Sequence, residues 1–144
     1  MSSSIAAFTT SYSGLSKKLI NNAEIVYQGR TFKTKFAQWD TGATDTCISE
    51  NVVKSLNLVP IGLTNIQTPS GSKTVYRYIV DIILPSNVTI KDVEVNDCDI
   101  GKQGIDILIG MNIISLGDFA VSNYQNQTKF SFRIPSEKHT DYVQ

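Results

Sequence analysis

The chain of 144 residues has few of the side chains that bind metals or activate nucleophiles: two cysteines and one histidine. Cys47 and Cys98 lack the spacing of a metal motif, and His139 lies in a polar C-terminal segment, so a zinc site or a His-based triad is hard to build. A disulfide is possible, but we expect two buried free thiols in an intracellular chain. The sequence therefore predicts no metal, no cofactor and a cytoplasmic location.

An excess of charge and a long apolar run are also missing. Thirteen basic and thirteen acidic residues give a formal net charge of +0, and 41% of the residues are hydrophobic. Nothing in this balance favours nucleic-acid binding or disorder, and no apolar run reaches membrane-spanning length. The N-terminal residues lack the basic and apolar regions of a signal peptide. We therefore expect one domain whose partners are neither nucleic acid nor membrane.

Short apolar segments separated by turn residues dominate the rest of the sequence. They predict seven or more short strands and two short helices, one after Ser49 and one at residues 111–114. Residues 1–16 are rich in Ser and Thr and are predicted to be loose or a partial strand. We place the folded domain at residues 17–135 and a polar tail at 136–144. The pattern is that of a mostly β domain with a closed sheet.

The strand predicted over residues 31–39 leads directly into Asp40-Thr41-Gly42-Ala43-Thr44. A glycine can take backbone positions that are crowded or have positive φ, and threonine hydroxyls can pin a turn. Such a loop would hold one carboxylate rigidly at a surface. The tripeptide Asp-Thr-Gly alone is equally compatible with an ordinary turn after a strand.

A second motif, Leu108-Ile109-Gly110, precedes the predicted helix at residues 111–114. Together, the two motifs and their order resemble the retropepsin-like (retroviral-protease-like, single-domain) aspartic protease family, bacterial type, over about residues 23–135. The resemblance implies a closed β-barrel-like acid protease fold with two short helices. It also implies that the segment 108–110 crosses beneath the active-site loop and supports it.

The resemblance implies roles for individual residues. Asp40 would be catalytic, and Thr41, Gly42, Ala43 and Thr44 would form the active-site loop. The hairpin predicted around residues 69–72 would be the flap that closes over the substrate, although an ordinary surface hairpin is the plainer interpretation. The substrate-binding residues would be Asp45, Pro69, Ser70, Gly71 and Ser72.

The chemistry of this family needs two carboxylates that share a proton, one to activate water and one to polarise the carbonyl. The chain contains a single Asp-Thr-Gly. A two-fold homodimer can bring the same residue to its axis from both chains. The resemblance therefore implies an aspartic endopeptidase that hydrolyses peptide bonds with one Asp40 from each subunit.

Two features depart from the pattern. Viral members carry an arginine after the glycine of the second motif, whereas this chain has Met111-Asn112, which leaves the mode of dimerisation open, and Gln38 is more polar than a buried strand prefers. Because a fold does not fix function, a non-catalytic peptide-binding or dimerisation module of the same fold is an alternative. A glycosidase fits poorly, because its two acids come from distinct positions.

Overall fold

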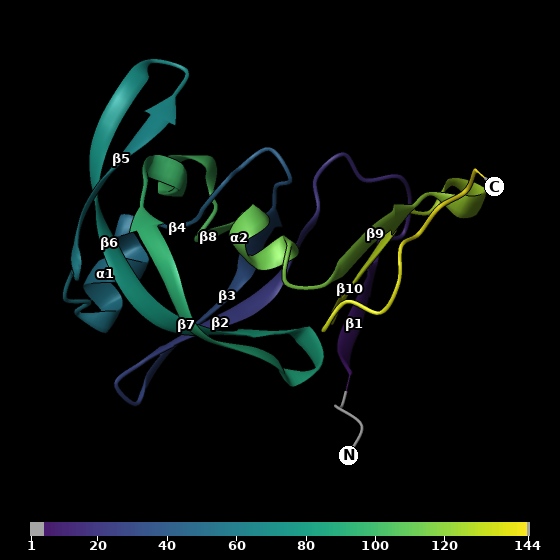
Figure 1. Ribbon diagram of the computed structural model, residues 1–144, viewed down its shortest axis with the longest axis horizontal. Helices are drawn as coiled ribbons and strands as arrows, with labels where there is room; N and C mark the ends of the chain where they lie inside the picture. The colour runs from purple at the N-terminus through teal and green to yellow at the C-terminus, as the bar shows by residue number, and fades with distance from the viewer. Residues whose placement is uncertain (1–4, 144) are drawn as a thin grey trace.

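The computed structural model describes residues 5–143, in which strands dominate and helices are brief (Figure 1). The strands are β1 (Ala6–Ser11), β2 (Ile20–Tyr27), β3 (Arg30–Trp39), β4 (Thr46–Ile48), β5 (Gly62–Thr68), β6 (Gly71–Leu84), β7 (Val88–Asp97), β8 (Ile107–Ile109), β9 (Asp118–Ser122) and β10 (Lys129–Ile134). The helices are α1 (Glu50–Leu56), η1 (Pro85–Asn87), η2 (Asp99–Gln103), α2 (Met111–Ile114) and η3 (Tyr124–Asn126). None of the helices in this part of the chain is long and apolar enough to cross a membrane.

Six strands form a closed ring. Neighbouring strands follow the order β2-β3-β8-β4-β7-β6, and a further pairing of β2 with β6 closes the ring. β5 follows β6 at the end of this order and makes a hairpin with it. The pairings of β3 with β8 and of β4 with β7 are parallel, although these strands are far apart in the sequence. The predicted mostly β fold, a closed barrel with two short α-helices, is confirmed.

Local sequence features explain where several elements begin and end. The Ser49 side chain caps α1 by accepting a hydrogen bond from the Val52 N–H, and Asn57 ends the helix in the left-handed conformation. Gln28 and Gly29, with φ of 49° and 77°, form the tight turn between β2 and β3. The ends of these elements are thus set by residues within a few positions of them.

A three-stranded sheet, in the order β1-β10-β9, joins the two ends of the chain. Residues 6–11, predicted to be loose or a partial strand, form β1 and pair along their length with β10; residues 1–4 lie outside the described part. Phe8 is buried, and its ring packs against Trp39 with 5.6 Å between centroids. Trp39 also stacks on Phe119. The apolar face of this sheet therefore covers the end of β3.

Asp118 ties the C-terminal segment to this sheet. Its carboxylate accepts hydrogen bonds from the Ser136 hydroxyl (2.5 Å), the Glu137 N–H (2.8 Å) and the Arg133 Nε (2.8 Å). These donors hold the pKa of Asp118 well below its ordinary value of 3.8. The start of the polar tail is therefore bound to the folded domain by a charged group.

We expect Asp118→Asn to destabilise the protein at pH 7 and to have a smaller effect in acid. The native state binds a proton at Asp118 less readily than the unfolded chain does, so the carboxylate stabilises the fold. This contribution is complete above pH 3.8 and declines as the pH falls below it toward the lowered native pKa. Urea unfolding at pH 7 and pH 2.5 measures the change, with Asp141→Asn in the exposed tail as the control. An equal loss at both pH values would contradict this account.

Candidate active site

Asp40 lies at the point where β3 leaves the barrel. Trp39 is opposite Ile109 of β8, and the Asp40 N–H continues this ladder by donating to the Ile109 carbonyl (2.9 Å). The Asp40 Oδ1 accepts a hydrogen bond from the Gly42 N–H (2.8 Å), and the Ala43 N–H donates to the Asp40 carbonyl (3.2 Å). A Cβ at Gly42 would lie 3.1 Å from the same Oδ1, so a side chain there would press on the carboxylate. The loop itself therefore orients a partly exposed carboxylate.

The segment 108–110 passes directly beneath this loop. The Met111 N–H, at the start of α2, donates to the Ala43 carbonyl (2.7 Å). A Cβ at Gly110 would lie 2.7 Å from the Asp45 carbonyl carbon and 2.8 Å from the Ala43 oxygen. The two sequence motifs are thus in contact, and the contact leaves no room for a side chain at Gly110.

Two polar residues that the sequence motifs do not include complete this support. The buried Thr46 hydroxyl donates to Asn112 Oδ1 (2.6 Å) and accepts from the Gly110 N–H (3.1 Å). The Asn112 N–H donates to the Thr44 carbonyl (3.1 Å), and its Nδ2 donates to the Glu94 carbonyl (3.2 Å). Neutral hydrogen bonds therefore brace the loop at the place where viral members of the resembled family carry an arginine. In the sequence, the one sign of this support is Thr46, a polar residue at the start of the otherwise apolar strand β4.

Gln38, Leu108 and Cys47 form a row across β3, β8 and β4, which we call the outer row. Gln38 is opposite Leu108, and Leu108 is opposite Cys47. The neighbours of each residue along its strand, such as Ala37 and Trp39, are buried in the core. Because side chains alternate along a strand, the outer row points away from the core, and its members are partly exposed. The row begins two residues before Asp40.

Cys47 and Cys98 form a disulfide, so the prediction of two buried free thiols is wrong. β4 and β7 are parallel neighbours with Ile48 opposite Asp97, which brings the two cysteine Cα atoms to 5.9 Å. Their separation of 51 residues hides this proximity in the sequence. Both cysteines are partly exposed rather than packed in the core.

We expect Gln38→Met to raise the free energy of unfolding by about 1 kcal/mol. The Gln38 Oε1 is buried and accepts no hydrogen bond from any residue in the range 5–143. An apolar side chain of similar length removes this unpaired group and keeps the contacts of its stem. Urea unfolding measures the change, and Gln103→Met at an exposed position is the matched control. A loss of stability in Gln38→Met would show that the Gln38 amide makes hydrogen bonds in solution that methionine cannot replace.

The hairpin of β5 and β6 presents the predicted flap residues. Thr68 is opposite Gly71, so Pro69 and Ser70 form the turn, and all the residues from 69 to 72 are exposed. Gly71 has a φ of 118°, which only glycine adopts readily. Figure 1 shows the hairpin (teal) and the loop between β3 and β4 (blue) on the same upper side of the barrel. Asp45 is exposed in that loop.

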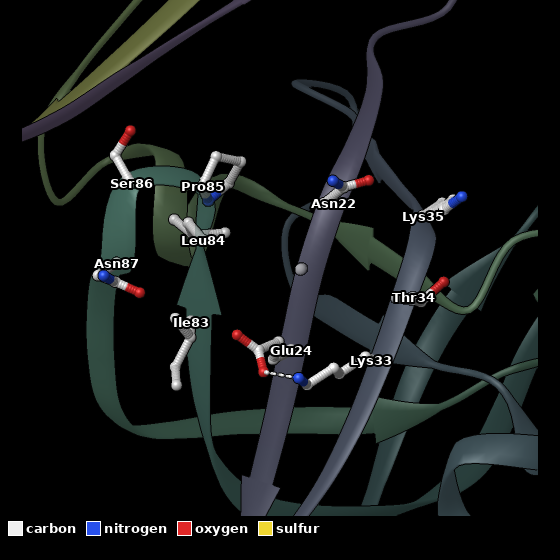
Figure 2. A pocket seen from close by; sticks show the side chains of 11 residues that line it. Asn22, Glu24, Lys33, Thr34, Lys35, Ile83, Leu84, Pro85, Ser86 and Asn87 are labelled. Carbon is white, nitrogen blue, oxygen red and sulfur yellow. Dashed lines mark ion pairs between the residues drawn. The ribbon is translucent and has the colours of Figure 1, made fainter.

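A cavity of about 430 Å³ lies elsewhere, between β2, β3 and η1 (Figure 2). Its wall includes an ion pair between Lys33 and Glu24, with 3.8 Å between the Lys33 Nζ and a Glu24 carboxylate oxygen. Pro85 and Asn87 line the opposite side. No residue of the loop 40–45 lines this cavity, so it is separate from the candidate active site.

At least one solved structure shares this architecture. In fold, the chain is similar to a retropepsin-like aspartic protease from Rickettsia conorii, with 13% identity, a TM-score of 0.59, and coverage of 92% of this chain and 96% of that one. The simian foamy virus (mac) protease has 26% identity and a TM-score of 0.46, with coverage of 67% and 92%. No curated protein matches the sequence.

The sequence comparison with protein families covers both motifs. The profile described as aspartyl protease matches residues 15–113, more than half of the chain, and this range includes Asp40 and Gly110. The chain therefore belongs to the aspartyl protease family, and its fold is retropepsin-like.

Proposed function

We propose that the protein is an aspartic endopeptidase in which Asp40 from two identical chains forms the catalytic pair. The observation that carries this proposal is the setting of Asp40. Its carboxylate is partly exposed at the end of β3, and Gly42 and the segment 108–110 hold its loop. A rigid, accessible acid of this kind is what water activation requires.

A single chain lacks the second acid of the pair, because it has one Asp-Thr-Gly. In a two-fold dimer the two Asp40 carboxylates would approach each other, and like charges so close share one proton. The ionised carboxylate takes a proton from water while the protonated one donates a hydrogen bond to the peptide carbonyl. Thr41, exposed beside Asp40, would face its mate across the axis.

Exposed apolar side chains between α2 and β9 support a second copy as the partner. Met111, Leu116 and Val121 are 37%, 49% and 39% exposed, and they follow the chain from α2 into β9. β9 is an edge strand of its three-stranded sheet, so one side of its backbone is free to pair. Because α2 adjoins the catalytic loop, contact through this surface would bring the two loops together.

The substrate would be an extended peptide held between the loop and the β5–β6 hairpin. In this proposal the hairpin acts as a flap, with Pro69, Ser70, Gly71 and Ser72 at its tip. Asp45 and the outer row would contact the peptide on either side of the cleaved bond. The exposure of the tip and its position on the side of Asp40 support this role.

Mixing subunits tests the paired mechanism. If one part of wild type exchanges with three parts of Asp40→Asn, only about one quarter of the wild-type chains pair with another wild-type chain. Activity per wild-type chain on a peptide library should fall to about one quarter. An excess of Asp141→Asn, changed in the exposed tail, should cause no such loss. Undiminished activity in a monomeric sample would overturn the paired mechanism, and peptide binding without cleavage by wild type would favour the non-catalytic module.

A further inference from the structure

The Cys47–Cys98 disulfide lies where three functional segments meet. Cys47 directly follows Thr46, whose hydroxyl bonds Gly110 and Asn112 beneath the loop of Asp40. Cys47 is also the last member of the outer row. Cys47 is therefore next to the residue that supports the loop of the candidate active site.

The other end of the disulfide belongs to the base of the β5–β6 hairpin. The Cys98 N–H donates to the Ile48 carbonyl (3.0 Å). Its neighbour Asp97 accepts a hydrogen bond at Oδ1 from the Tyr76 N–H in β6 (3.0 Å). A single covalent bond therefore connects β4, the strand after the Asp40 loop, with the neighbour of Asp97, the residue that bonds to β6.

A cavity of about 300 Å³ lies beside Cys98. Cys98 lines it, together with Val53 of α1 and Val75 of β6, whereas Cys47 does not. This volume can admit a small molecule. Cys98 therefore lies at a cavity, whereas Cys47 lies in the partly exposed outer row.

Two charged residues that line this cavity, Lys73 and Asp97, form no ion pair among residues 5–143. Asp97 accepts a hydrogen bond from the Tyr76 N–H, so Lys73 is the unpaired cation of the lining. The other charges are paired, Lys54 with Glu50 (2.9 Å) and Asp99 with Lys102 (3.3 Å). A positive charge near a disulfide favours the thiolate, which is the form that attacks and the form that leaves.

We propose that the Cys47–Cys98 bond is a thiol–disulfide exchange site, opened at Cys98 by a low-molecular-weight thiol that enters this cavity. The thiolate attacks the Cys98 sulphur, the S–S bond breaks, and Cys47 leaves as a thiolate that takes a proton from water. A second thiol molecule attacks the mixed disulfide and releases Cys98 as a thiol. The protein disulfide is reduced, and two thiol molecules are oxidised to their own disulfide.

Opening the bond has a consequence for the hairpin. Without it, the end of β7 at Asp97 and Cys98 keeps its pairing with β4 but loses its covalent link, so the base of the hairpin opens more often. In a reducing compartment, such as the cytoplasm that the sequence predicts, the bond would be opened. The further consequence, a lower rate of peptide cleavage in the reduced protein, rests on the proposed function.

Two single-cysteine variants test the site without any measurement of cleavage. Cys47→Ser leaves Cys98 at the cavity, and Cys98→Ser leaves Cys47 in the outer row. With oxidised glutathione as the probe, mass spectrometry should show adduct formation at least about ten times faster on Cys98 than on Cys47. Equal rates, or faster reaction of Cys47, would overturn the proposal. If the variants do not fold, wild type treated briefly with reduced glutathione and then alkylated should carry glutathione on Cys98, and adducts on Cys47 would overturn it.

Two further measurements test the role of the cation and the link to the hairpin. Lys73→Gln should slow the reaction of reduced glutathione severalfold, whereas Lys129→Gln on distant β10 should not. Hydrogen exchange of residues 62–77 should be faster in reduced than in oxidised wild type, while the β1–β10 ladder stays unchanged. Unchanged exchange in the hairpin would show that the bond does not control it, whatever the protein cleaves.

Discussion

Replacing Asp40 by Asn is expected to lower kcat/KM for peptide cleavage by about a thousand-fold or more. The change removes the charge and the shared proton on which water activation depends. The fold should persist within about 1 kcal/mol, because an Asn Oδ1 can still accept the hydrogen bond from Gly42. Cleavage of a peptide library at pH 4 to 7 and urea unfolding measure the two effects.

The matched control is Asp141→Asn, which makes the same chemical change in the exposed C-terminal tail. It should cleave peptides at the wild-type rate. Cleavage that survives in pure Asp40→Asn protein would refute the role of this carboxylate. Loss of cleavage together with unfolding would instead show that Asp40 is needed for the loop.

Gly110→Ala should cost about 3 kcal/mol or more of stability and remove most of the activity. The added Cβ would lie 2.7 Å from the Asp45 carbonyl carbon and 2.8 Å from the Ala43 oxygen. These are backbone atoms, so they cannot rotate away as a side chain can. The loop that holds Asp40 must shift, and a shift of this kind would misplace the carboxylate.

Gly14→Ala is the control for this substitution. No heavy atom lies within 4 Å of a Cβ at Gly14, and its φ is compatible with alanine. Its stability should stay within about 0.5 kcal/mol of wild type. Urea unfolding and peptide cleavage of both variants measure the contrast. If Gly110→Ala is as stable and active as Gly14→Ala, the loop does not depend on the close approach of segment 108–110.

The motifs could be recognised in the sequence because each depends mainly on residues that are close together in the chain. Asp40 to Thr44 follow a strand and form a turn closed by their own hydrogen bonds. Ser49 caps the helix that begins beside it. The glycine at residue 110 was recognisable by its place after two apolar residues, although the atoms that require it lie in the loop 43–45.

Other features of the site depend on residues that no local pattern connects. Thr46 and Asn112 are 66 positions apart and meet only because β8 and β4 are neighbours. The same arrangement hid the disulfide, since a separation of 51 residues gave no reason to pair the cysteines. The packing of Phe8 in β1 against Trp39 was missed because the sequence of β1 is rich in threonine and serine and its partner strand is at the other end of the chain.

By itself, the sequence determined the mostly β class, the acid-bearing turn, the two short helices and the hairpin, because turns, caps and alternation act over a few residues. The tertiary structure alone decided what surrounds that acid. Parallel pairing of β3 with β8 placed Gly110 under the loop, parallel pairing of β4 with β7 closed the disulfide, and antiparallel pairing of β4 with β8 joined Thr46 to Asn112. Parallel neighbours are joined by long connections, so which strands meet depends on how the whole barrel closes.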